Sequence, residues 1–124
     1  MMGGRGQKYT VVMRLPNAST AKIPSAKLKN YLLNPSKDAN KAKFFQSLGY
    51  NMKNAARLQR DIRAKLKTNK ALKYETDQYG NTSFQVNMQL GINKKAIVAT
   101  AWIIDKGSNI PRFVTAYQNK KLNK

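Results

Sequence analysis

Three polar side chains near the C-terminus, in the stretch PRFVTAY, suit phosphate chemistry: Arg112, Thr115 and Tyr117. An arginine can hold two oxygens of one phosphate, and a hydroxyl or phenol can donate a hydrogen bond or transfer a proton. The phenylalanine, valine and threonine of this stretch favour a β-strand. We therefore predict that a strand carries these side chains into a site for a phosphate-bearing ligand.

RNA is a ligand that such groups can cleave without a metal ion, because its own 2′-hydroxyl attacks the neighbouring phosphate. The protein then supplies a base for the 2′ proton, cations for the charge that develops on the phosphorane, and an acid for the leaving oxygen. Two helix lysines complete the set that we predict to be catalytic: Lys27, Lys41, Arg112, Thr115 and Tyr117.

Each assignment has a structural alternative. Lys27 and Lys41 fit equally well as exposed helix lysines, and Thr115 fits as a residue that favours strands. Arg112 could instead bind Asp105 or a turn carbonyl, and the ring of Tyr117 could only stack.

The sequence offers few of the residues that other catalytic or metal-binding sites need. It contains no histidine and no cysteine, so a zinc site is excluded. Its five acidic residues are scattered, whereas a two-metal nuclease needs convergent carboxylates. No Gly-rich phosphate loop leads into a helix. We predict neither a metal ion nor any other cofactor.

The charge of the chain indicates a polyanionic partner. Lysine and arginine total 24 against five acids, which gives a net charge of +19. Self-repulsion of this size destabilises a compact chain, and a polyanion relieves it. We predict that RNA is the partner, ahead of an anionic membrane surface; an acidic protein that neutralises the chain also fits. The segment 51–67 has apolar residues at helical spacing on one side, and its other side carries predicted phosphate contacts at Lys53, Arg57, Arg60 and Lys67.

The elements that must position these side chains follow a helices-then-strands order. A strand is an option at 8–16; helices are expected at 25–33, 38–49 and 51–67; and strands are expected at 71–76, 82–90, 96–105 and 111–117. Short turns favour an antiparallel sheet. We predict an α+β fold in which about three helices cover one face of a four-stranded antiparallel sheet, with an additional N-terminal strand left open.

The uncovered face of that sheet is the expected binding surface. Phe84, Val86, Met88 and Leu90 alternate with Gln85, Asn87 and Gln89, so the apolar set is predicted to face the helices. In the next strand Thr100 and Trp102 are expected on the uncovered face. In the last strand the same face is expected to carry Phe113, Thr115 and Tyr117. Trp102 and Phe113 would then stack on unpaired bases; their alternative is a place in the core.

Length and composition indicate a single domain. The 124 residues divide into a loose N-terminus (1–7), one domain (8–118) and a basic tail (119–124). No apolar run approaches the roughly 18 residues of a membrane span, and no secretory signal is evident. We therefore expect no membrane partner.

Four stretches together resemble a family of small bacterial domains: IPSAKLKNYLLN, KAKFFQSLGY, DQYGNTSFQV and TAWIIDKGSNIPRFVTAY. Members of that family occur alone and at the C-termini of filamentous-haemagglutinin-like and phage-head-like proteins. The setting resembles that of polymorphic toxin modules, many of which share the barnase, EndoU, colicin and RelE type of fold. The polar positions that match are Lys27, Tyr31, Lys41, Arg112 and Thr115, with Tyr117 beside them.

The resemblance implies helices packed on a four-stranded antiparallel sheet and ribonuclease activity on tRNA, mRNA or rRNA. It also implies a small acidic immunity or antitoxin protein that covers the open face. The site of action would be cytoplasmic, reached either directly or by delivery as the C-terminal module of a secreted protein. Two alternatives stay open: a non-catalytic RNA- or DNA-binding module that blocks translation, and a basic protein that docks an acidic partner.

Overall fold

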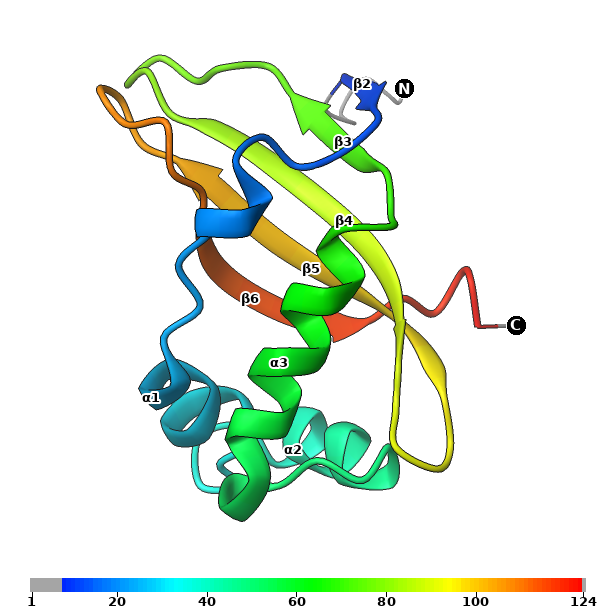
Figure 1. Cartoon of the computed structure of the whole chain (residues 1–124). Helices are drawn as coiled ribbons and strands as arrows, with labels where there is room; N and C mark the ends of the chain where they lie inside the picture. The colour runs from blue at the N-terminus through cyan, green and yellow to red at the C-terminus, as the bar shows by residue number, and fades with distance from the viewer. Residues whose placement is uncertain (1–7, 124) are drawn as a thin grey trace.

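A five-stranded antiparallel sheet forms the centre of the molecule in the computed structural model, which describes residues 8–123 (Figure 1). The strands are β2 (Tyr9–Val12), β3 (Ala71–Tyr74), β4 (Thr82–Leu90), β5 (Ala96–Ile104) and β6 (Arg112–Gln118). They lie in the order β2-β3-β4-β5-β6. The α+β prediction is confirmed, and the optional N-terminal strand joins the same sheet as its fifth member. The predicted loose segment 1–7 lies outside the described residues.

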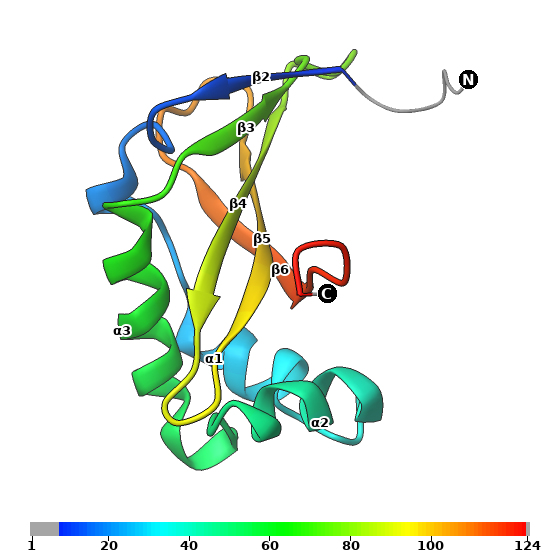
Figure 2. The same ribbon diagram turned by 90° about the vertical axis from the view of Figure 1, so that its right-hand side faces the viewer.

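The helices precede β3 and cover one face and one end of the sheet (Figure 2). They are the 3₁₀ turn η1 (Ala18–Thr20), α1 (Ser25–Lys27), the π-helical η2 (Leu28–Leu32), α2 (Ala39–Ser47), the 3₁₀ turn η3 (Met52–Asn54) and α3 (Ala55–Leu66). Asp38 caps α2 by accepting a hydrogen bond from the Lys41 backbone N–H at 2.9 Å. Among residues 8–123, no helix is long and apolar enough to cross a membrane.

The covered face of the sheet forms the core with α3. Phe84, Val86, Met88 and Leu90 of β4 are all buried, as their alternation predicts. Opposite them α3 buries Leu58, Ile62 and Leu66, which recur at the spacing of a single helix face.

The predicted orientation of β5 is wrong by one residue. Thr100 and Trp102 pair with Val86 and Phe84, so they share the covered face and are buried rather than outward. Their polar atoms are satisfied inside the core: the Thr100 hydroxyl donates to the Val86 carbonyl at 2.8 Å, and the Trp102 indole N–H donates to Thr100 Oγ1 at 2.8 Å. These bonds remove the usual cost of burying a hydroxyl and an indole N–H.

A β-bulge changes the phase of β6. Trp102 pairs with Phe113 whereas Ala101 pairs with Thr115, so Val114 is the extra residue. Phe113 therefore lies on the covered face, buried edge-on against Trp102 with ring centroids 5.5 Å apart. The prediction that Trp102 and Phe113 stack on bases at the surface is wrong. After the bulge Ala116 is buried and Tyr117 is exposed, as predicted.

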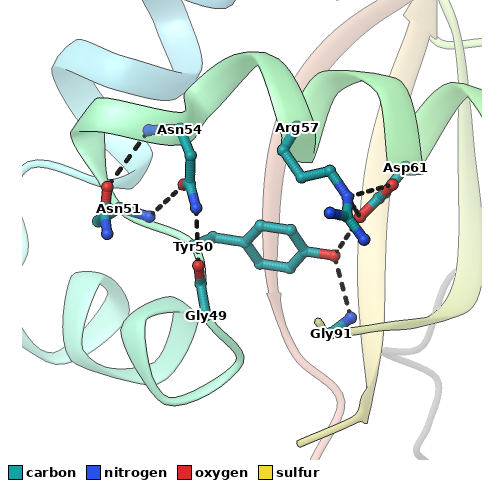
Figure 3. Close-up of polar contacts among 7 residues, drawn as sticks. All are labelled: Gly49, Tyr50, Asn51, Asn54, Arg57, Asp61 and Gly91. Carbon is teal, nitrogen blue, oxygen red and sulfur yellow. Dashed lines mark hydrogen bonds and ion pairs between the residues drawn. The ribbon is translucent and has the colours of Figure 1, made fainter. Parts of the chain in front are cut away.

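A polar cluster around Tyr50 fastens the helices to the β4–β5 turn (Figure 3). The Tyr50 ring is fully buried; its hydroxyl donates to Asp61 Oδ2 at 2.7 Å and accepts from the Gly91 N–H at 3.0 Å. Arg57, one turn before Asp61 on α3, donates to both carboxylate oxygens at 3.1 Å. Gly91 has φ +141°, and a Cβ there would lie 2.0 Å from the Lys94 carbonyl oxygen, so only glycine fits.

Candidate functional site

A groove of about 810 Å³ opens on the uncovered side of the sheet, between the start of α2, strand β6 and the C-terminal segment. Its walls include Lys41 and Phe44 of α2, Gln85 of β4, Tyr117 of β6, and Lys120 and Lys121 that follow. In Figure 2 this segment lies on the side of the sheet opposite α3. Lys41 and Tyr117, predicted from positions 76 residues apart, thus line one hollow.

Two helix lysines reach strand β6 close to its bulge. Lys41 Nζ donates to Thr115 Oγ1 at 3.4 Å, and Lys27 Nζ donates to the Phe113 carbonyl at 3.4 Å. β6 is the edge strand of the sheet; the Lys22 backbone bonds to Pro111 and Phe113 on its outer side, which also accepts these two lysine contacts. The structure therefore brings Lys41 and Thr115 into contact and places Tyr117 two residues further along the strand. Lys27 reaches the same strand at Phe113 but does not line the groove.

A chain of hydrogen bonds crosses the open face beside Tyr117. Tyr74 donates to Gln85 Oε1 at 3.4 Å, Gln85 Nε2 donates to Asn87 Oδ1 at 2.9 Å, and Asn119 Nδ2 donates to the same oxygen at 3.0 Å. Burial raises the pKa of Tyr74 above its ordinary value, with smaller contributions from Tyr117 and Tyr9. The chain fixes the orientation of the Gln85 amide at the floor of the hollow.

The C-terminal segment is held against the sheet by asparagine side chains. The Asn123 amide donates to the Ile97 carbonyl at 2.7 Å and accepts from the Ile97 N–H at 2.6 Å, which extends the β5–β6 pairing by one rung. The Asn119 N–H also donates to the Ile97 carbonyl, at 3.1 Å. Residues 119–121, which belong to the predicted basic tail, thereby line the groove and place Lys120 and Lys121 in its wall.

Arg112 is not brought into the groove. Its guanidinium donates to Asp105 Oδ2 at 2.7 Å and to Asp105 Oδ1 at 3.0 Å, the structural alternative noted above. This pairing lowers the pKa of Asp105 and raises that of Arg112, chiefly through the hydrogen bonds. Both side chains are about half exposed, at 44% each. Arg112 lies five residues before Tyr117, roughly 16 Å along an extended strand.

The predicted phosphate contacts of α3 also lie apart from the groove. Arg57, Arg60 and Lys67 belong to the helix and its C-cap, and Lys53 precedes it in η3. Because α3 packs on the covered face, its solvent side points away from the groove (Figure 2). Arg57 is in addition bound to Asp61 in the Tyr50 cluster.

Most cations of the described chain form no ion pair with an acidic side chain. Within residues 8–123, ion pairs join Arg57 to Asp61 and Arg112 to Asp105, and no others form. In the same part of the chain, no three His, Cys, Asp or Glu side chains gather where a metal ion could be held. The cations of the groove are therefore available to an anion from solution.

Sequence reasoning missed several residues that shape this site. Gln85 and Asn87 were correctly predicted on the uncovered face. Their hydrogen bonds to Tyr74 and Asn119 depend on how the strands pair, which the sequence pattern does not give. Asn119 and Asn123 belong to no periodic sequence pattern that would have marked them. Their position was the one available signal: Asn119 directly follows the last strand and Asn123 comes four residues later, where an amide side chain can continue the hydrogen bonds of the sheet.

Comparison with known proteins gives a family without a known activity. The family described as "Domain of unknown function (DUF6883)" matches residues 14–120. No curated protein and no solved structure matches the chain.

Proposed function

Since the chain belongs to the DUF6883 family, whose function is unknown, we propose its function from the groove: it binds RNA there and cleaves it without a metal ion. The observation that carries this proposal is the lining of the groove. Lys41, Lys120 and Lys121 stand around one hollow together with the phenol of Tyr117. Lysines hold phosphate oxygens, and aromatic rings in a basic groove suit unpaired bases.

The proposed reaction uses the RNA's own nucleophile. The 2′-hydroxyl oxygen forms a bond to phosphorus while its proton passes to a base of the protein. The bond from phosphorus to the 5′ oxygen then breaks, and that oxygen takes a proton from an acid of the protein. The products are a 2′,3′-cyclic phosphate and a free 5′-hydroxyl, so no oxidant, reductant or water is consumed.

Lys41 and Tyr117 are the groups we assign to this step. The Lys41 ammonium, steadied by Thr115 Oγ1, lies where it can stabilise charge on the phosphorane. Tyr117 is 43% exposed at the groove, and its phenol can donate the proton that the 5′ oxygen takes. The Asp38 carboxylate, which also lines the groove, can accept the 2′ proton. Lys27 holds the edge of β6 through the Phe113 carbonyl and is assigned a positioning role.

The experiment is incubation of the purified protein with total RNA in the presence of EDTA. We expect fragments that end in a 2′,3′-cyclic phosphate, and none with the Lys41→Ala variant. Lys43→Ala is the matched control, because Lys43 is an exposed lysine of the same helix outside the groove. RNA that is bound in the groove but stays intact would overturn the catalytic part.

A second candidate is a non-catalytic RNA-binding module. It is favoured by the position of Arg112, since the side chain best suited to clamp a phosphorane is bound to Asp105 instead. Binding without cleavage in the same experiment would select it.

The resemblance to toxin modules supports a cytoplasmic toxin-type role with an acidic neutralising partner. The charge supports it as well, because four of the five acids accept hydrogen bonds inside the protein and offset few cations. Production of the chain alone should then arrest bacterial growth, and co-production of the partner should restore it. Normal growth with abundant folded protein would contradict the toxin role.

A further inference from the structure

A second hollow of about 380 Å³ adjoins the groove on the open face of the sheet. Gln85 and Tyr117 line both cavities, so the two are neighbours. The second hollow lies over Ala101, with Tyr74, Ser83 and Ile103 around it. Ala101 creates it, because a small side chain on β5 stands between the longer side chains of β4 and β6.

The two cavities differ in charge. Three lysines and one carboxylate, Asp38, line the groove, whereas no charged side chain of the described residues lines the second hollow. A nucleotide has the same division, with a charged phosphate joined through a sugar to an uncharged flat base. We propose that the second hollow receives the base of an unpaired ribonucleotide whose phosphate lies in the groove, an inference that rests on the proposed function.

The phenol rings give the hollow its suitability for a base. Tyr74 and Tyr117 both line it and come from strands on either side of β4 and β5. Tyr74 is kept in place by edge-on packing with Tyr9, whose ring centroid lies 5.7 Å away. Aromatic rings on a sheet surface are platforms on which unstacked bases pack.

The Gln85 amide gives the hollow a polar contact of matching chemistry. One of its N–H groups bonds to Asn87 and its oxygen accepts from Tyr74, which leaves one N–H and one lone pair unused. Every base carries a donor next to an acceptor on its Watson–Crick edge, the complement of such an amide. That edge is free only in an unpaired base, so the hollow should take single strands and exclude duplexes.

The test compares ligands that differ only in the base. Binding of the four ribonucleoside 5′-monophosphates and of ribose 5-phosphate is measured by calorimetry on the intact chain. We expect the nucleotides to bind roughly 5- to 150-fold more tightly, which is the stacking contribution of one base. Equal affinity for the nucleotides and for ribose 5-phosphate would overturn the proposal without any variant.

Filling the hollow gives a second, independent readout. Ala101→Ile places a strand-favouring side chain in it, and Gln89→Ile places the same side chain on the same face outside both cavities. Ala101→Ile should abolish the preference for nucleotides over ribose 5-phosphate, and Gln89→Ile should keep it. Should Ala101→Ile fail to fold, Gln85→Leu replaces it as a test of the amide and should reduce the preference.

The outcomes separate this inference from the proposed function. Suppose that RNA binds, that Lys41→Ala weakens this binding, and that Ala101→Ile keeps the preference for nucleotides over ribose 5-phosphate. The groove is then supported as the RNA site, and the proposed base site is wrong. If RNA does not bind at all, both are wrong. Tighter binding of a single-stranded oligonucleotide than of its duplex, lost in Ala101→Ile, supports both.

Discussion

Tyr50 and Tyr117 stand in two polar clusters that use the same kinds of side chain in opposite ways. The Tyr50 hydroxyl is buried, donates to Asp61 and accepts from Gly91, and the Asp61 carboxylate is also bound by Arg57. Tyr117 is exposed at the groove, where the nearest lysine contact is the 3.4 Å bond from Lys41 to Thr115. The first cluster is saturated within the protein, and the second keeps donors and cations for a ligand.

The contrast between the two clusters separates residues that stabilise the fold from residues that can bind a ligand, in a chain that is rich in lysine. A saturated polar cluster stabilises the fold because each buried group has a partner, and losing one leaves the others unsatisfied. An unsaturated cluster at the surface costs little to keep, because water occupies its free groups until a ligand replaces it. Mutations should therefore affect stability at Tyr50 and binding or rate at the groove.

The largest expected effect concerns salt, because the groove's cations lack acidic partners. If roughly six to ten phosphates are engaged, RNA affinity should fall by about 10³ to 10⁵ between 50 and 200 mM salt. Filter binding or fluorescence anisotropy measures this slope, with Lys120→Ala and Lys121→Ala each lowering it by about one counterion. An affinity that stays constant over this range would remove the electrostatic basis of the comparison.

The next effect concerns rate. Lys41→Ala should slow cleavage on the order of 10²- to 10³-fold, as expected when one preorganised charge is lost from the transition state. Arg57→Ala removes a cation of the saturated cluster and should leave the rate nearly unchanged, once measured at a temperature where the variant is folded. Equal losses in the two variants would show that the groove is not a distinct site.

The third effect separates the two tyrosines. Tyr50→Phe leaves the Gly91 N–H without its acceptor and removes one of the two donors to Asp61, so that Arg57 remains, and should lower the free energy of unfolding by about 1–3 kcal/mol. Tyr117→Phe, at an exposed position, should change it by less than about 0.5 kcal/mol while slowing cleavage. Urea unfolding of both variants measures the first quantity. A larger loss of stability in Tyr117→Phe would reverse the comparison.

The contribution of Tyr50 to the free energy of unfolding should also depend on pH. Burial raises the pKa of Tyr50 above its ordinary value of 10.0, with the hydrogen bond to Asp61 adding to the effect. Its neutral form is thus favoured in the folded state, and this contribution is full below pH 10 and is lost as the pH rises further. The stability difference between the wild type and Tyr50→Phe should therefore narrow above about pH 10.

The sequence was sufficient for the architecture and for part of the site. Strict alternation in β4 predicted its buried face, and helical spacing predicted the buried side of α3. β5 has apolar residues in both phases, so its orientation could not be read from alternation. The bulge at Val114 shifts the phase within β6 and leaves no periodic trace, which is why Phe113 was misplaced.

Proximity in sequence was also a poor guide to a shared site. We grouped three residues by their spacing in sequence: Arg112, Thr115 and Tyr117. The extended strand holds Arg112 apart from Tyr117, and the Arg112 guanidinium binds Asp105 instead. Lys41 reaches Thr115 from helix α2. The sequence grouped the two residues only through the need for a cation and through the family resemblance. The groove itself depends on the Asn119 and Asn123 bonds, which exist only after the sheet has formed.

The smallest expected effect concerns the Arg112–Asp105 pair, which tests whether Arg112 belongs with the saturated or the unsaturated groups. Its guanidinium is bidentate to Asp105 and lowers the pKa of that carboxyl below its ordinary value of 3.8. A lowered pKa contributes stability above about pH 4, and the contribution is lost as the pH falls through the folded-state value. Because the pair is exposed to solvent, Asp105→Asn should reduce the thermal midpoint only slightly at pH 7, and the difference from the wild type should shrink as the pH falls below about 4. Arg112→Ala should do the same and leave cleavage almost unaffected. A collapse of the cleavage rate in folded Arg112→Ala, with no such pH-dependent difference in stability, would place Arg112 in the site instead of in the architecture.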